Sequence, residues 1–121
     1  MIGELAKWGE DRACQELKNK GHFILSRNFR NRAGEIDIIS KINELIVITE
    51  VKTRTSRFLS SPTKTISLRK QRTIINVANN YLREKNIDLE VRFDIVTIIK
   101  NSVVCEIEHL EGAFYPNSYS G

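Results

Sequence analysis

Residues 34–54 read GEIDIISKINELIVITEVKTR, and this stretch decides the expected fold. It contains two runs rich in the β-branched side chains favoured in strands: residues 35–40, which alternate around Ile36 and Ile38, and residues 45–54. The residues between the runs, 41–43, suit a turn. The two runs therefore predict a β-hairpin.

The faces of this hairpin separate charged from apolar side chains. Because side chains alternate along a strand, a turn with an even number of residues pairs odd positions of one strand with even positions of the other. Asp37 then shares a face with Glu50 and Lys52. The same face carries Ile39, Ile46 and Ile48, and the opposite face carries Ile36, Ile38, Leu45, Val47 and Val51. This mixed face predicts that the charged residues line an active site at the edge of a hydrophobic core. A turn with an odd number of residues, or a β-bulge, would invalidate this prediction.

The segments around the hairpin predict two helices and three further strands. Residues 3–20 have helical periodicity and 23–29 suit a strand, while 55–65 form a Ser/Thr-rich loop before a helix at 68–85. Strands at 89–99 and 103–109 complete the order αβββαββ. This order predicts an α/β or α+β fold with a central mixed sheet flanked by helices. We expect one domain, residues 1–114, and a poorly ordered tail, residues 115–121.

Composition narrows the class of protein. The chain has 121 residues, 40% hydrophobic and 28% charged, and no apolar run approaches the ~20 residues of a membrane span. The N-terminus lacks the features of a secretory signal, so we expect a cytoplasmic protein. Cys14 and Cys105 have no metal or redox spacing and are predicted to be reduced apolar fillers. His22 and His109 are predicted to have surface or capping roles.

Basic residues are distributed unevenly over a chain of net charge +4. Residues 51–83 contain no acid and eight basic residues: Lys52, Arg54, Arg57, Lys64, Arg69, Lys70, Arg72 and Arg83. A second basic cluster, Arg27, Arg30 and Arg32, precedes the hairpin. A solvated surface and a nucleic-acid contact are equally compatible with such runs. Arg27, Asn28 and Arg30 could contact phosphates or stabilise the first strand.

Each predicted helix directs one polar residue toward the core. Glu10 falls within the stripe formed by Ile2, Ala6, Gly9, Ala13 and Leu17. Gln71 lies along the stripe formed by Leu68, Ile75, Ala78 and Leu82. Glu10 could form a structural ion pair or take part in a site, and Gln71 could be a satisfied core amide.

The charged face of the hairpin suits metal-assisted chemistry. Two carboxylates in a partly dry site attract a hard divalent cation, so Asp37 and Glu50 are candidate ligands of Mg²⁺ or Mn²⁺, with the backbone carbonyl of Val51 as a third. Lys52 could orient or deprotonate a water, or stabilise the charge of the transition state. A salt bridge between Lys52 and either acid is the alternative.

Several motifs together resemble a known family. They are Gly9-Glu10 with Ala13, Arg27-Asn28-Phe29-Arg30, Gly34-Glu35-Ile36-Asp37, Glu50-Val51-Lys52-Thr53-Arg54, Arg69-Lys70-Gln71, Arg92-Phe93-Asp94 and Ala113-Phe114. The chain resembles the uncharacterised bacterial YraN-like family, and its acid followed by Glu-x-Lys is similar to the PD-(D/E)XK pattern of restriction-endonuclease-like nucleases. Ile36 stands where that signature has proline.

The resemblance implies a fold shared with archaeal Holliday-junction resolvases and a site composed of Asp37, Glu50, Lys52, Glu10 and Gln71, with Glu10 joining the metal ligands. We therefore expect a Mg²⁺- or Mn²⁺-dependent endonuclease acting on DNA, on branched or damaged forms in particular. The expected nucleic-acid contacts are Arg27, Asn28, Arg30, Arg54, Arg69, Lys70 and Arg72. A non-catalytic nucleic-acid-binding or adaptor module is the alternative, and a homodimer is left open.

Overall fold

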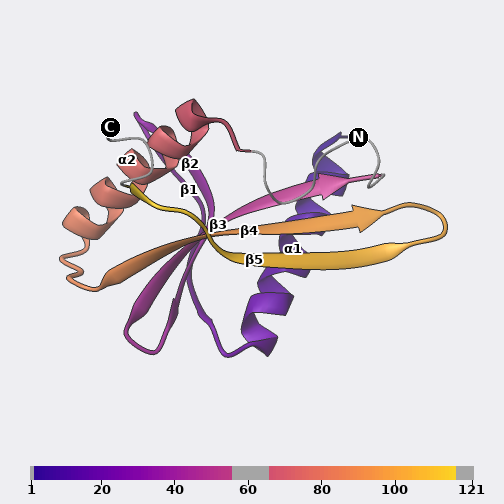
Figure 1. Ribbon diagram of the computed structural model, residues 1–121, viewed down its shortest axis with the longest axis horizontal. Coiled ribbons are helices and arrows are strands. Elements are labelled where there is room, and N and C mark those ends of the chain that lie inside the picture. Colours follow the sequence, from indigo (N-terminus) through magenta and orange to yellow (C-terminus); the bar gives the residue numbers. More distant parts are fainter. Residues whose placement is uncertain (1, 56–65, 117–121) are drawn as a thin grey trace.

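The computed structural model describes residues 2–55 and 66–116, and its elements follow the predicted order αβββαββ (Figure 1). Two helices and five strands occur in this part of the chain. They are α1 (Ile2–Asn19), β1 (Phe23–Asn31), β2 (Gly34–Ile42), β3 (Leu45–Arg54), α2 (Leu68–Glu84), β4 (Glu90–Lys100) and β5 (Cys105–Phe114). The predicted fold class is confirmed.

The strands form one mixed sheet in the order β1-β2-β3-β4-β5. Neighbours are antiparallel except β3 and β4, which are parallel from the pair Leu45–Glu90 to the pair Arg54–Ile99. Parallel neighbours need a crossover, and the segment containing α2 supplies it. The ends of β3 and β4 therefore lie side by side at one edge of the molecule.

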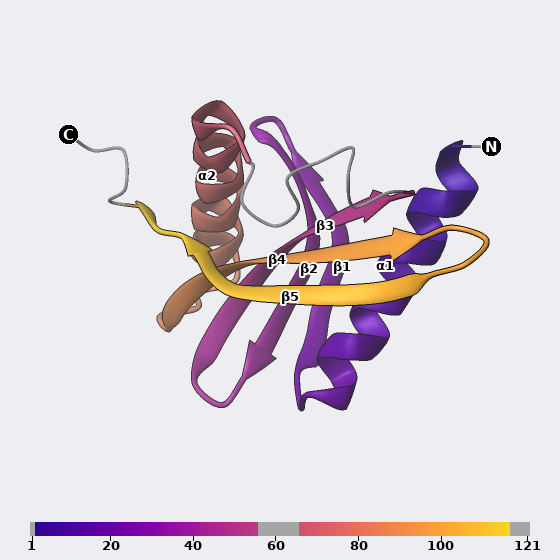
Figure 2. The ribbon, with the colours of Figure 1, turned by 45° about the vertical axis from the view of Figure 1, so that its right-hand side comes forward.

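The two helices pack on different faces of the sheet (Figure 2). The core beneath α2 includes Ile39 and Ile48, whereas the core beneath α1 includes Ile38 and Val96. Alternate residues of the central strands thus enter different cores, which is why both faces of the hairpin are apolar near its turn.

The predicted register of the hairpin is confirmed. Ile39 pairs with Ile48 and Ile38 pairs with Thr49. The face assigned to Ile36 was wrong, because Ile36 packs in the α2 core together with Ile39. Ile36 lies beyond the last pair between β2 and β3, which joins Ile38 to Thr49, so the register of the hairpin does not fix its face.

The helical stripes are confirmed only in part. In α1, Gly9, Ala13 and Leu17 are buried but Ala6 is exposed. In α2, Ile75 and Ala78 are buried, but Leu68 is 50% exposed because it lies in the first turn, before the part of the helix that packs on the sheet. Cys14 is buried as predicted. The prediction for Cys105 was wrong, because it is exposed at the start of β5.

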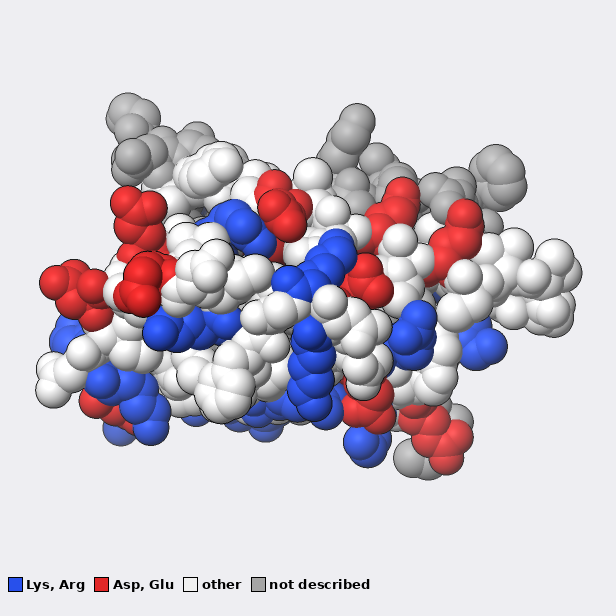
Figure 3. All heavy atoms as spheres, turned by 90° about the horizontal axis from the view of Figure 1, so that it is seen from below, with Lys and Arg blue, Asp and Glu red and all other residues white. Residues whose placement is uncertain are grey.

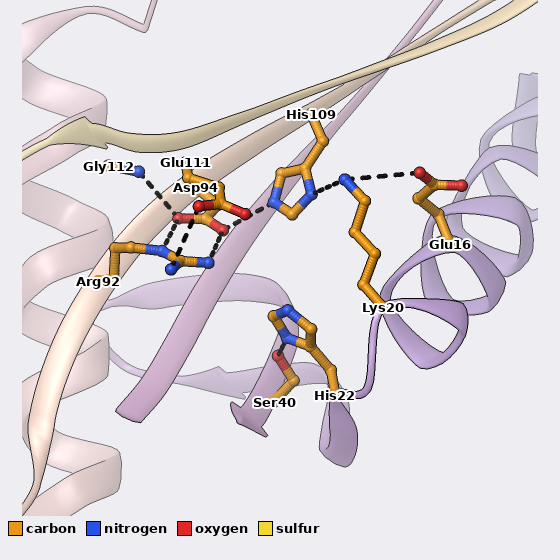
Figure 4. A network of polar contacts seen from close by, with 9 residues as sticks. All are labelled: Glu16, Lys20, His22, Ser40, Arg92, Asp94, His109, Glu111 and Gly112. Atoms are coloured by element: carbon orange, nitrogen blue, oxygen red, sulfur yellow. Dashed lines mark hydrogen bonds and ion pairs between the residues drawn. The ribbon is translucent and has the colours of Figure 1, made fainter. Parts of the chain in front are cut away.

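A buried polar network joins β4, β5 and the end of α1 (Figure 4). Asp94 accepts hydrogen bonds from Arg92 Nε at 2.8 Å, from His109 Nε2 at 2.7 Å and from the Gly112 backbone N–H at 3.0 Å. Lys20 Nζ lies 2.8 Å from His109 Nδ1. Because an ammonium group only donates, His109 Nδ1 is the acceptor of this hydrogen bond. Burial would raise the pKa of Asp94, but these hydrogen bonds outweigh it and lower that pKa.

The predicted surface position of the two histidines is therefore wrong, whereas the capping alternative holds for the backbone of His22, whose N–H donates to the Leu17 carbonyl at the end of α1. The His109 side chain is 2% exposed, and His22 is buried with its ring 2.9 Å from Ser40 Oγ. A polar side chain can be buried when the fold supplies partners from distant segments, and such partners cannot be seen in local spacing.

The ends of several elements differ from the prediction. β5 extends to Phe114, five residues beyond the predicted end at His109. The predicted loop and tail fall mainly on residues 56–65 and 117–121, which lie outside the described residues. Among the described helices, none is long and apolar enough to cross a membrane.

Candidate functional site

Asp37 and Glu50 meet where β2 and β3 cease to pair. The Val51 backbone N–H donates a hydrogen bond of 2.8 Å to Asp37 Oδ2, which links the carboxylate of β2 to the backbone of β3. Glu50 comes from the adjacent position of β3, and its side chain is 16% exposed. The structure thus brings the two predicted metal ligands together at the rim of the α2 core.

The carboxyl pair has an unusual proton affinity. Burial, followed by the negative charge of Glu50, raises the pKa of Asp37 to about 7, while the hydrogen bond from Val51 opposes the shift. The charge of Glu10 contributes in the same upward direction. A buried carboxyl beside other carboxylates is stabilised by a proton or by a cation, so the pair has the electrostatic character of a cation site.

Lys52 lies beside this pair and is 8% exposed. Burial lowers the pKa of its ammonium, the charge of Arg54 lowers that pKa further, and the charge of Glu50 opposes both effects. A lowered pKa increases the share of neutral amine near neutral pH, so Lys52 can accept a proton more readily than an exposed lysine can.

An open, polar pocket of about 340 Å³ adjoins these groups. It is lined by Glu50, Val51, Lys52, Arg54, Ile66, Ser67 and Lys70. Lys70 Nζ lies 3.2 Å from Glu50 Oε2, so the first turn of α2 places a cation against a predicted metal ligand. Ser67 caps α2 by accepting a 3.1 Å hydrogen bond from the Lys70 backbone N–H.

Glu10 reaches the same region from the other side of the sheet. A side chain at Gly9 would collide with Thr53 Oγ1, and this close approach of α1 to β3 positions Glu10. Glu10 Oε1 lies 2.9 Å from Asn28 Nδ2 and 3.4 Å from Arg27 Nη2. The ion-pair alternative considered for Glu10 is therefore present in the structure.

The remaining predicted residues are dispersed. Gln71 Nε2 donates to the Ile66 carbonyl at 2.9 Å, and its buried Oε1 has no hydrogen-bond partner among the described residues. Arg30 forms a 2.7 Å ion pair with Glu35 near the β1–β2 turn. Arg69 and Arg72 are exposed on α2.

The described residues of the basic stretch do not lie together at one place on the surface. Arg57 and Lys64 lie outside the described residues, and Arg83 lies ~20 Å along α2 from Lys70 at the helical rise per residue. On the face drawn in Figure 3, basic side chains (blue) lie between acidic ones (red). The pocket itself is the place where Arg54 and Lys70 come together.

The site offers a metal ion two carboxylate ligands, Asp37 and Glu50, and not three. In the part of the chain that the structure describes, no three His, Cys, Asp or Glu side chains form a group that could hold a metal. Asp37 and Glu50 are hard oxygen donors suited to Mg²⁺ or Mn²⁺, with the Val51 carbonyl and water as further ligands. Glu10 Oε1 contacts Asn28 and Arg27, so Glu10 is not counted among the direct ligands as its side chain stands.

Sequence reasoning missed two features of this site. Lys70 was assigned to nucleic acid alone, although it contacts Glu50. Arg27 is predicted to contact phosphate or to stabilise the first strand, and it forms a 2.7 Å ion pair with Asp11 of α1, a partner the prediction did not include. The sequence shows only that each basic residue has acidic residues on another element. It does not show which of them it meets, because helix and strand approach each other only in the folded chain.

The sequence matches the model of the uncharacterised protein family UPF0102 over residues 9–98. Three similar proteins, each called a UPF0102 protein, cover most of the chain. The protein of Flavobacterium psychrophilum is 39% identical over 93% of this chain and 94% of its own. That of Persephonella marina is 44% identical over 89% and 90%, and that of Alkaliphilus oremlandii is 42% identical over 94% and 100%.

Proposed function

Since the chain belongs to the uncharacterised protein family UPF0102, whose name assigns no activity, we propose its function from the site itself: a divalent-metal-dependent endonuclease that hydrolyses DNA phosphodiester bonds. The observation that carries this proposal is the Asp37–Glu50 pair with the buried Lys52 beside it at a polar pocket. The match to this family also agrees with the YraN-like resemblance, which implies the same chemistry.

The residues of the pocket suit a phosphodiester. Arg54 and Lys70 place positive charge on an open, polar pocket of about 340 Å³, and a negatively charged phosphate group is the substrate that this charge would attract. Positive side chains near a scissile phosphate also stabilise the charge that develops during hydrolysis. Nucleic acid is therefore the proposed partner, and DNA with branches or lesions is the proposed substrate.

Each residue near the pocket has a distinct proposed role. Asp37, Glu50 and the carbonyl of Val51 would hold Mg²⁺ or Mn²⁺, which supplies polarisation of the phosphate and a lower pKa of water. Lys52 would accept a proton from the attacking water or donate a hydrogen bond to the phosphate oxygens. Arg54 would orient the phosphate through its planar donor groups.

The test is cleavage of a broad panel: linear, nicked, flapped and four-way DNA, and single-stranded and double-stranded RNA, each with Mg²⁺ or Mn²⁺. We expect cleavage of at least one DNA form and its loss in Glu50→Gln. Glu44→Gln, which changes an exposed acid in the β2–β3 turn, serves as the matched control and should cleave normally. Metal binding and salt-dependent DNA binding without any cleavage would replace the nuclease by a nucleic-acid-binding module.

A further inference from the structure

Asn28 has a backbone conformation that is uncommon inside a strand. It belongs to β1 but has a φ of 53°, in the left-handed region. This region costs most residues other than glycine ~1–2 kcal/mol, and asparagine is among the residues that tolerate it best. A residue held in such a conformation invites a search for what its side chain does.

The register places this residue opposite a proposed metal ligand. β1 and β2 pair Arg27 with Ile38 and Phe29 with Ile36, so Asn28 stands across from Asp37. Asn28 and Asp37 are not themselves among the ladder pairs, although the register is the same on both sides of them. The irregular backbone thus coincides with the site and not with a turn or an end of the strand.

The side chain of Asn28 is directed toward α1. Its Nδ2 donates a 2.9 Å hydrogen bond to Glu10 Oε1, and Arg27 Nη2 lies 3.4 Å from the same oxygen. Arg27 is anchored in turn by its 2.7 Å contact with Asp11. Because both contacts end on Oε1, they orient the Glu10 carboxylate and leave Oε2 outside them.

Glu10 needs such contacts because it stands among like charges. Its hydrogen-bond partner Asn28 stands across from Asp37, so the Glu10 carboxylate lies in the neighbourhood of that carboxyl group. Repulsion would turn an unrestrained Glu10 toward solvent, whereas a donor amide and a guanidinium offset that repulsion.

We propose that Asn28, supported by Arg27, is a positioning residue that holds Glu10 beside the Asp37–Glu50 pair and thereby sets the metal affinity of the site. This inference rests on the proposed function. It removes Asn28 and Arg27 from the expected phosphate contacts and gives them a role within the protein. Glu10, oriented by Asn28, would then act on a bound metal ion from outside its direct ligands.

The experiment measures Mn²⁺ binding to the whole protein by calorimetry in two variants. Asn28→Gly keeps the left-handed backbone and removes the amide, and Asn28→Ala also removes the amide without adding a charge near the carboxylates. We expect both to weaken Mn²⁺ binding by about tenfold or more, the usual scale for losing a group that orients a metal site from outside. Asn43→Gly is the matched control, because Asn43 is also left-handed, with φ 52°, but lies in the β2–β3 turn.

A double-mutant cycle tests whether Asn28 acts through Glu10. On a Glu10→Ala background, Asn28→Gly should cause no further loss of Mn²⁺ affinity. An equal loss on both backgrounds would overturn the proposal, as would unchanged affinity in both Asn28 variants. If either result overturns the role of Asn28 while the wild-type protein still binds Mn²⁺ and cleaves DNA, the nuclease proposal stands. Wild-type protein that binds no Mn²⁺ would overturn the nuclease proposal and the role of Asn28 together.

The alternative role of Arg27 is separated by the salt dependence of DNA binding. An arginine that contacts phosphate contributes about 0.9 to the slope of log affinity against log salt. We expect Arg54→Gln to reduce the slope by about that amount and Arg27→Gln to leave it unchanged. A reduced slope in Arg27→Gln would return Arg27 to the phosphate contacts and overturn its positioning role.

Discussion

Metal binding at the proposed site should depend on pH through Asp37. Burial and the charge of Glu50 raise its pKa to about 7, so the metal-free protein carries a proton there below this pH. A metal ion requires the carboxylate, so binding expels that proton. Metal affinity should therefore increase as the pH rises toward 7 and level off above it.

The size of the effect follows from the pKa. With a pKa of about 7, the group is about 90% protonated at pH 6 and about 10% protonated at pH 8. The share of binding-competent carboxylate, and with it the Mn²⁺ affinity, should rise about tenfold over this interval. The number of protons released on binding should fall from about 0.9 to about 0.1.

The same shift has a consequence for stability without metal. A carboxyl whose pKa is raised on folding binds more protons in the native state than in the unfolded state. Its contribution is present below the unfolded value, near pH 4, and is lost as the pH rises through about 7. Metal-free protein should therefore lose stability over this range, and bound metal should restore it.

The assay is calorimetry of Mn²⁺ binding at several pH values in two buffers of different ionisation enthalpy, which counts the released protons. Asp37→Asn should bind weakly and release almost none. Asp88→Asn alters an exposed aspartate outside the site and should keep the wild-type profile. Wild-type affinity that stays constant from pH 6 to 8, with no proton release at pH 6, would refute the assignment of Asp37 as a ligand in this environment.

Three further predictions concern the catalytic, structural and binding residues. Lys52→Ala should lower the single-turnover cleavage rate at saturating DNA by ~100-fold or more with little change in DNA affinity, and an unchanged rate would exclude its catalytic role. Gly9→Ala should lower the unfolding free energy measured in urea, because contact with Thr53 costs ~1–3 kcal/mol against ~0.5–1 kcal/mol gained in helix propensity; a stabilised variant would contradict the close packing. On the Lys52→Ala background with Mg²⁺, Lys70→Gln should reduce the slope of log DNA affinity against log salt by about 0.9, while Arg83→Gln should leave that slope unchanged. Equal slopes in Lys52→Ala and in the two double variants would remove Lys70 from the DNA contacts.

The order of elements and the charged hairpin face could be predicted because both depend on local pattern. Alternating apolar residues define strands, and a short even turn fixes which residues share a face. Asp37, Glu50 and Lys52 were accordingly placed together before any tertiary contact was known, and the observed pairing of Ile39 with Ile48 agrees. This reasoning does not hold for Ile36, which lies beyond the last β2–β3 pair and packs with Ile39 in the α2 core.

The partners of charged side chains depended on tertiary structure. Lys70 is predicted to contact phosphate, and Arg27 to contact phosphate or to stabilise the first strand. In the structure they meet Glu50 and Asp11, which belong to elements distant in sequence. His109 was expected at the surface, but Asp94 and Lys20 enclose it. The sequence by itself determined which segments are strands or helices and which side chains could do chemistry, because periodicity is a local property. Only the packing of α1 and α2 against the sheet decided which charges neutralise one another, because that depends on distances in the folded chain.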